Sequence, residues 1–179
     1  VITRFSAFFH LQSLANYDFS RNVGFFSGLA VRNVGFIYDD PVNTEIRKKF
    51  RTYNLGVPIA IKLGDLDNRF IYLGYELEIP FNYKEKTFIN ENKEDKFNVW
   101  FSDRTPTLLH SAFLGINGVS GMSIKFKYYL TSLFNQDFTF VQDGNTIQPF
   151  QNFEANVFYI SVSFDLFKNT KFYYSDKFE

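Results

Sequence analysis

The sequence predicts an all-β protein, an antiparallel up-and-down transmembrane β-barrel. Two observations lead to this prediction. Apolar and polar residues alternate strictly over stretches of about a dozen residues, longer than the roughly five or six residues of a typical soluble strand. Short turns and long polar loops also alternate along the chain, as they do when all turns lie on one side of a membrane and all loops on the other.

The composition excludes several classes of protein and of functional site. The 179 residues include 25 Phe, 11 Tyr, one Trp and no Cys, and the mean hydropathy is -0.18. No stretch approaches the roughly 20 consecutive apolar residues of a membrane-spanning helix. The 19 Lys and Arg balance the 19 Asp and Glu, so the chain lacks the basic excess of nucleic-acid-binding proteins. The absence of cysteine excludes disulfides, thiolate nucleophiles and thiolate metal sites.

The clearest strands form a hairpin. From Tyr53 to Leu63 every odd position is apolar, and the even positions are small or polar. The rule repeats over 71–84 after a turn-rich segment at 64–68, so the two strands are predicted to be antiparallel neighbours. Further copies of the pattern, some of them weaker, bring the prediction to seven strands. These are 3–16, 23–38, 51–64, 71–84, 108–119, 122–131 and 158–166.

Alternation alone does not say which face is buried. In a soluble barrel the apolar face points inward, whereas in a membrane barrel it meets lipid. Small residues such as Gly56, Ala60 and Gly74 on the polar face suit a narrow closed interior. Aromatic residues near strand ends, such as Tyr53 and Phe134, suit the level of the lipid headgroups. We therefore expect lipid to contact the aliphatic rows.

Strand parity predicts one strand more than this chain displays. Single-chain bacterial barrels have an even number of strands. The strand at 3–16 leads into a short turn, which places Val1 on the outer side. We therefore expect eight strands, with an ascending strand before Val1 or supplied by a partner. The predicted organisation is a barrel over 1–167 and a periplasmic C-terminal tail over 168–179.

Charged residues at inward positions are expected to pair, because an isolated buried charge is costly. Glu76 and Glu78 share the inward face of one strand, and Lys125 and Lys127 lie at a similar height one strand removed. We predict an interior charge network of these four residues with Arg32 nearby. It is expected to fill the interior, with an ion path or gate as the alternative. Flanking lysines keep both carboxylates ionised, which leaves no general acid for glycoside hydrolysis.

No catalytic constellation and no cofactor are expected. His10 and His110 are the only histidines, too few for a metal site without cysteine. His10 is predicted to point inward at mid-barrel, and His110 to lie near the outer rim. The catalytic site considered is an acyl-transfer triad of His110, Asp103 and either Ser102 or Ser111. The spacing of these residues matches no known nucleophile motif.

The long loops are expected to carry the contacts to other molecules. The loop at 86–107 ends in an apolar cluster that is predicted to contact a protein partner, with fold-back onto the barrel as the alternative. This cluster consists of Phe97, Val99, Trp100 and Phe101. A basic set near the outer rim is predicted to bind lipid phosphates, including those of lipopolysaccharide. This set consists of Arg47, Lys48, Lys49 and Arg51.

A few short strings carry a resemblance to a known family. They are Arg21-Asn22-Val23-Gly24-Phe25-Phe26-Ser27-Gly28-Leu29, Arg32-Asn33-Val34-Gly35-Phe36-Ile37, and the end of a Phe-rich last strand, Phe164-Asp165-Leu166-Phe167. The chain resembles the small outer-membrane β-barrel proteins of Bacteroidota, the PorT-like group, over most of its length. The resemblance implies an eight-stranded barrel in the bacterial outer membrane. It does not fix a function, since some relatives serve secretion or assembly machineries.

These observations lead to one expected function and two alternatives. We expect a non-enzymatic outer-membrane barrel that acts as a structural or accessory subunit of a larger assembly or secretion complex. A narrow channel or small-molecule-binding barrel is the first alternative. The second is a soluble lipocalin-like barrel, which requires the aliphatic rows to be buried away from water.

Overall fold

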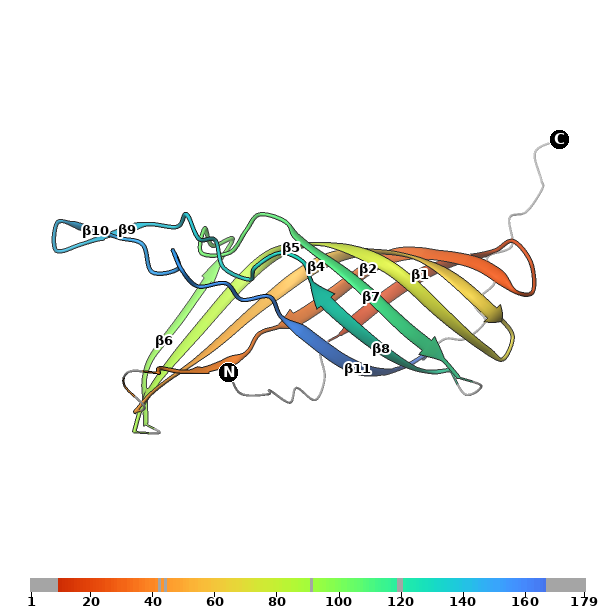
Figure 1. The fold of residues 1–179 in the computed structure, drawn as a ribbon, viewed down its shortest axis with the longest axis horizontal. Coiled ribbons are helices and arrows are strands. Elements are labelled where there is room, and N and C mark those ends of the chain that lie inside the picture. The colour runs from red at the N-terminus through yellow and green to blue at the C-terminus, as the bar shows by residue number, and fades with distance from the viewer. Residues whose placement is uncertain (1–9, 42, 44, 91, 119–120, 167–179) are drawn as a thin grey trace.

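A computed structural model describes residues 10–41, 43, 45–90, 92–118 and 121–166 (Figure 1). The strands in chain order are β1 (Leu11–Asp18), β2 (Val23–Val34), β3 (Ile37–Asp39), β4 (Ile46–Asp65), β5 (Arg69–Ile89), β6 (Asn92–Trp100), β7 (Leu109–Asn117), β8 (Met122–Tyr129), β9 (Phe140–Gln142), β10 (Asn145–Ile147) and β11 (Phe158–Phe164). This part of the chain contains strands and turns but no helix. It accordingly offers no helical segment able to span a membrane.

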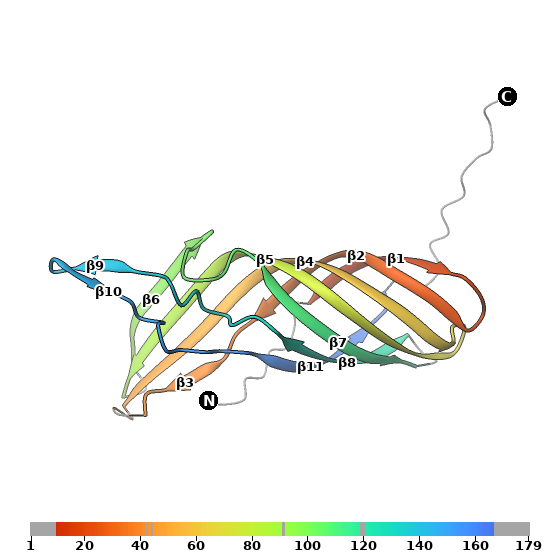
Figure 2. The ribbon, with the colours of Figure 1, turned by 45° about the horizontal axis from the view of Figure 1, so that its top comes forward.

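Nine strands form one antiparallel sheet, in which seven follow one another in the order β1-β2-β4-β5-β7-β8-β11, while β3 pairs with β4 and β6 with β5. Each strand pairs with its neighbour along this path, so the topology is up-and-down, and the sheet curls into a half-barrel (Figure 2). The predicted all-β antiparallel class is therefore confirmed. Strands β1 and β11 end the path, and among the described residues no ladder joins them. The eighth strand stays a prediction.

The β4–β5 hairpin forms the centre of the sheet. Its ladder runs from Asp65↔Arg69 to Ile46↔Ile89. The turn lies within the segment predicted for it, where the Asp65 carboxylate accepts a hydrogen bond from Asn68 Nδ2 at 2.6 Å. This hydrogen bond, and others from nearby backbone N–H groups, stabilise the ionised carboxylate and so lower the pKa of Asp65 below its usual value. These contacts favour the tight turn and so fix the register of both strands.

The structure corrects several predicted boundaries. The strand predicted at 3–16 is observed over Leu11–Asp18, and residues 1–9 lie outside the described part. The strand predicted at 23–38 divides into β2 and β3 around residues 35–36. The long loops predicted at 39–50 and 86–107 were wrong in part, because β4 begins at Ile46, β5 continues to Ile89, and β6 pairs with it. The predicted tail at 168–179 also lies outside the described residues.

Strands β4 and β5 continue beyond the seven-stranded region, where β3 pairs with β4 and β6 pairs with β5 to form a twisted extension. The β9–β10 hairpin projects from the same end (Figure 1). The segment that carries this hairpin packs back onto the sheet. Its residues Leu133, Phe134, Phe150 and Ala155 form one apolar cluster with buried side chains of the strands, including Tyr83. The end of the half-barrel opposite the β4–β5 turn is thus covered by its own loop.

A second apolar cluster fills the turn end of the half-barrel. It consists of Phe26, Ala60, Tyr72 and Phe113. The rings fit because small residues lie beneath them: a methyl group at Gly115 would overlap the Tyr72 ring. Small side chains lie beside large ones across the interior. Along β5, Glu76 and Glu78 lie between Tyr72 of this cluster and Tyr83 of the first one.

Candidate functional site: an enclosed ion network and two outer surfaces

Three strands, β2, β5 and β8, bring opposite charges together inside the sheet, although no two of them are neighbours in it. Arg32 of β2 directs Nε to Glu76 Oε1 of β5 at 2.8 Å and Nη2 to Glu76 Oε2 at 3.2 Å. Lys127 of β8 donates to Glu76 Oε2 at 2.6 Å and also to Glu78 Oε1. We call Arg32, Glu76, Glu78 and Lys127 the ion network. All four side chains are essentially inaccessible to solvent.

Neutral side chains complete the hydrogen bonding of the network. The Tyr129 hydroxyl donates to Glu78 Oε2 at 2.8 Å, and Asn54 Nδ2 donates to the same oxygen at 2.7 Å. Gln12 Oε1 accepts from Arg32 Nη2 at 3.0 Å. Tyr129, Asn54 and Gln12 were not predicted to belong to the network, although each occupies an inward position of its strand. Buried charges that are paired and hydrogen-bonded in this way are tolerated in a low-dielectric interior.

The position of Lys125 departs from the prediction. It points inward and is only 7% exposed, but among the described residues it makes no ion pair with Glu76 or Glu78. Its ammonium lies 5.4 Å from the centre of the Phe113 ring. Lys125 is aligned with Gly115 in the ladder, whereas Lys127 is aligned with Phe113, one interior level nearer the carboxylates. The predicted network therefore holds one lysine directly and leaves the other at its edge.

The outward faces carry the aliphatic rows. Leu55, Ile59 and Ile61 of β4 are exposed, and so is Leu73 of β5, which is 65% exposed. A soluble lipocalin-like barrel requires these side chains inside and the charges outside, which is the reverse of the observed arrangement. A contiguous apolar surface of this extent is unusual on a soluble monomer.

An aromatic group borders the aliphatic rows at the outer end. The Phe81 ring centre lies 6.4 Å from that of Tyr53 and 5.8 Å from that of Trp100. A register shift at Tyr53/Asn54 reverses which face the residues of β5 occupy beyond this point. We call Tyr53, Phe81 and Trp100 the aromatic trio. Such rings favour the interface between hydrocarbon and water.

Cationic side chains follow directly above the aromatic trio. Lys49, Lys86 and Lys96 lie opposite one another on three adjacent strands, and Arg51 lies opposite Lys84. We call these five residues the basic ladder. Partial loss of hydration, and then the charges of its neighbours, lower the pKa of Lys86 below its usual value. Like charges placed directly opposite repel one another, so this face favours an anionic ligand.

The basic set predicted from sequence is only partly on this face. Lys49 and Arg51 belong to the basic ladder. Lys48 points to the other face of β4, where its ammonium lies 3.3 Å from Glu85 Oε1, because successive residues of a strand alternate between faces. Arg47 pairs with Asp39, Nε to Oδ1, at 2.7 Å. Lys84, Lys86 and Lys96, which sequence reasoning did not assign to this function, take part instead.

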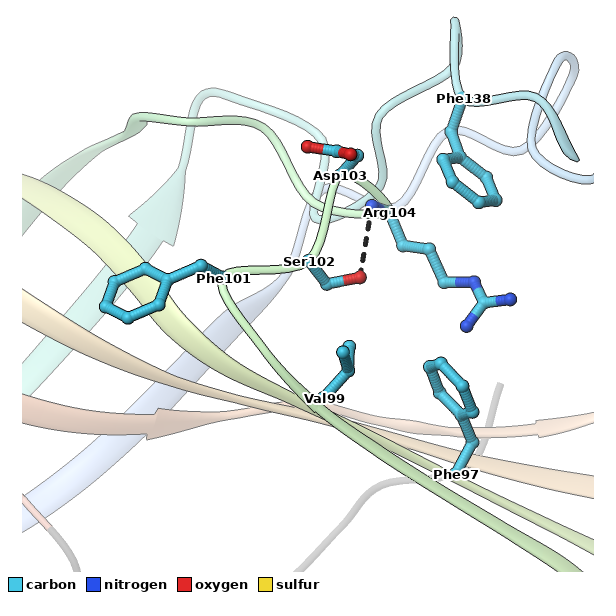
Figure 3. Close-up of a pocket in the computed structure, with 7 residues that line it drawn as sticks. All are labelled: Phe97, Val99, Phe101, Ser102, Asp103, Arg104 and Phe138. Carbon is cyan, nitrogen blue, oxygen red and sulfur yellow. Dashed lines mark hydrogen bonds between the residues drawn. The ribbon is translucent and has the colours of Figure 1, made fainter.

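The predicted partner cluster divides between two faces for the same reason. Phe97 and Val99 line an open cavity of about 240 Å³, together with Phe101, Ser102, Asp103, Arg104 and Phe138 (Figure 3). Trp100 belongs to the aromatic trio on the opposite face of β6. The Arg104 guanidinium lies 4.1 Å from the Phe97 ring centre and 5.2 Å from that of Phe138, whereas the Phe101 ring points away from it (Figure 3).

The residues weighed for acyl transfer are not brought together. His110 faces outward, where its Nδ1 contacts the Tyr75 hydroxyl. Ser111 faces inward and donates to the Glu76 backbone oxygen at 3.0 Å. Ser102 Oγ accepts the Arg104 backbone N–H at 3.3 Å. His10 lies against the Tyr159 ring, with 4.8 Å between ring centres.

Comparison of the chain with protein-family models, with curated proteins and with solved structures gave no match. Function therefore has to be inferred from the chain's own geometry.

Proposed function

We propose that the chain is a β-barrel of the bacterial outer membrane that catalyses no reaction and acts as a structural or accessory subunit of a larger outer-membrane complex. One observation carries this proposal: the aliphatic rows face outward while Arg32, Glu76 and Lys127 are enclosed. That arrangement suits a protein whose exterior solvent is hydrocarbon. It is unfavourable in water, where apolar surface would be covered and charges would be hydrated.

The order of side chains along the outward face supports the membrane part of the proposal. Aliphatic rows are followed by the aromatic trio and then by the basic ladder. Hydrocarbon, interface and anionic headgroups follow one another in the same order across a lipid leaflet. The ligands proposed for the basic ladder are the phosphate groups of outer-leaflet lipid, including lipopolysaccharide.

The filled interior and the outer cavity support the accessory part. Apolar clusters lie above and below the ion network, which favours a solid barrel over a channel. The cavity around Phe97 and Arg104 presents two aromatic rings, a guanidinium and an exposed Asp103. Exposed aromatic and arginine side chains recur at protein interfaces, so the proposed partner binds at this end.

Two measurements test the proposal. The full chain is produced in a Gram-negative host, and the membranes are separated and washed with alkaline carbonate. The protein is then extracted in mild detergent after cross-linking and its mass is measured. We expect it in the outer-membrane fraction, in a species larger than the monomer that Phe97→Ser dissociates and the matched change Phe19→Ser leaves intact. A carbonate-soluble protein contradicts the membrane assignment, and a monomer without a cross-linked partner contradicts the accessory role.

A conductance measurement separates the proposal from a narrow channel. Reconstituted into planar bilayers, a solid barrel gives no discrete current steps. Reproducible steps that Glu76→Gln alters would favour the channel instead.

A further inference from the structure

The buried charges of the half-barrel do not balance. Four cationic side chains are enclosed: Arg32, Lys62, Lys125 and Lys127. Three carboxylates pair with them in the described part of the chain. Glu76 and Glu78 belong to the ion network, and Asp18 lies 2.6 Å from the Lys62 ammonium. Lys125 is the cation left over.

Lys125 is nearly as well buried as the two enclosed lysines that have carboxylate partners. It is 7% exposed, whereas Lys62 is 3% exposed. Its nearest described aromatic neighbour, Phe113, offers a ring face at 5.4 Å, a contact worth far less than an ion pair in a site shielded from water. A lysine in this position either meets an anion or loses its proton.

Unsatisfied polar atoms gather on the same side of the interior. His10 Nδ1 and the Tyr159 hydroxyl are buried and have no hydrogen-bond partner among the described residues. Tyr159 is aligned with Lys127 in the β8–β11 ladder, one interior level from Lys125, and Ser161 is aligned with Lys125 itself. The His10 and Tyr159 ring centres lie 4.8 Å apart.

In the part of the chain that the structure describes, this region is also where the half-barrel is open, since no ladder joins β1 and β11. Gln12 and Asn16 of β1 point inward, since they accept hydrogen bonds from Arg32 and Lys62, yet both are exposed. Tyr159 and Ser161 of β11 remain half-buried. An added group can therefore reach Lys125 between β1 and β11 without displacing a packed side chain.

We propose that Lys125 holds one anionic group, a carboxylate or a small inorganic anion, inside the barrel between β1 and β11, with the Tyr159 hydroxyl as a hydrogen-bond donor to it. The group belongs to a dissolved anion or to the side chain of a strand added between β1 and β11. These two strands run in the same direction, so an added strand antiparallel to both would complete the sheet. The inference does not depend on the proposed outer-membrane function.

Chloride is the probe for a dissolved anion. The full chain is folded into detergent micelles, and the ³⁵Cl NMR line width is titrated with chloride and then competed with acetate. We expect saturable broadening that Lys125→Met weakens by about tenfold or more in chloride affinity. The matched control Lys93→Met, which removes an exposed cation outside both the ion network and the basic ladder, is expected to retain the site. This result assigns the anion to solution.

The urea midpoint of unfolding tests for an attached carboxylate. If wild type shows no broadening assigned to Lys125, and Lys125→Met has a lower midpoint than Lys93→Met, the carboxylate belongs to an added strand. If Lys125→Met does not fold, Lys125→Gln replaces it, and the chloride titration of wild type stands without any substitution. The proposal is overturned if chloride binding does not depend on Lys125 and the Lys125 variant is at least as stable as wild type, because a neutral lysine without an anion is improved by an apolar replacement.

Discussion

Arg32 and Glu76 face each other across the interior of the half-barrel, on strands separated by β4. The Arg32 Nε lies 2.8 Å from Glu76 Oε1, and the two side chains are 1% and 0% exposed. They are 44 residues apart in sequence. The pair joins two parts of the curled sheet that backbone hydrogen bonds do not connect directly, and so it favours one curvature of the sheet.

Removal of one member of this pair is expected to be strongly destabilising. Arg32→Met leaves Glu76 with Lys127 alone, and we expect a loss of about 3–5 kcal/mol in the free energy of unfolding. The double change Arg32→Met/Glu76→Met is expected to restore part of the loss, because Lys127 still meets Glu78. Urea unfolding in micelles, followed by Trp100 fluorescence, measures both. Equal stability of Arg32→Met and wild type would contradict a pairing role.

Gly56 is expected to tolerate no side chain. A methyl group there would overlap the Glu76 carboxylate, which the ion network holds in place. Gly56→Ala is therefore expected to cost about 1–3 kcal/mol of unfolding free energy. At the control position, Gly118→Ala, the nearest atom is 3.5 Å from the new methyl group, so no comparable loss is expected. A similar effect of both substitutions would show that the network adjusts freely.

Trp100, the only tryptophan of the chain, reports the depth of the aromatic trio. It is 62% exposed on the outward face. In bilayers we expect stronger quenching of its fluorescence by lipids brominated near the headgroup than by lipids brominated near the chain end, because indole rings prefer the interface. Full quenching by aqueous iodide, with none by brominated lipid, is the result that would refute insertion to this depth.

The basic ladder is expected to bind phosphate-bearing lipid. Removing Lys86 takes one cation from the row Lys49–Lys86–Lys96, and each basic residue near an anionic membrane contributes about 1 kcal/mol. Lys86→Ala is therefore expected to weaken binding to soluble lipopolysaccharide aggregates and to reduce its salt dependence. Arg69→Ala removes an exposed cation at the turn end of β5 and serves as the control. Equal losses in both variants would argue for nonspecific attraction.

The buried Tyr83 hydroxyl is expected to make the free energy of unfolding decrease at alkaline pH. Burial, and then the neighbouring Glu85 carboxylate, raises the pKa of Tyr83 far above its usual 10.0. The folded state keeps this hydroxyl protonated, so its contribution to the free energy of unfolding is complete below pH 10. Above pH 10 the hydroxyl ionises in the unfolded chain, and this contribution is progressively lost as the pH rises. Unfolding of wild type and Tyr83→Phe between pH 9 and 12 is the comparison. We expect the decline with pH to be shallower in Tyr83→Phe, and parallel declines would show that Tyr83 ionises freely.

The ion network could be predicted in part from the sequence. The alternation placed Glu76, Glu78 and Lys127 on inward faces, and the cost of an isolated charge required them to meet. It did not distinguish Lys127 from Lys125, which is two residues away on the same face. That choice depends on the stagger between β5, β7 and β8, and stagger is a property of the assembled sheet.

The outer surfaces were less accessible to sequence reasoning. The charged run at 93–96 resembled a solvated loop, so the sequence did not predict β6 or its pairing with β5. Because β6 pairs with β5, the residues from Phe97 to Phe101 are divided between the two faces of a strand instead of forming one cluster. The same pairing places Lys96 beside Lys86. Contacts between paired strands depend on how the strands are aligned, and the local order of apolar and polar residues does not predict that alignment.

The residues alone determined the antiparallel all-β class and the sorting of side chains between two faces, because a strand's period of two is written directly in the order of apolar and polar residues. Tertiary structure decided which charges touch, where the register shifts at Tyr53/Asn54, and that Lys125 is left without a carboxylate in the described part of the chain. Those outcomes depend on curvature and stagger, which arise only when the strands are packed against one another.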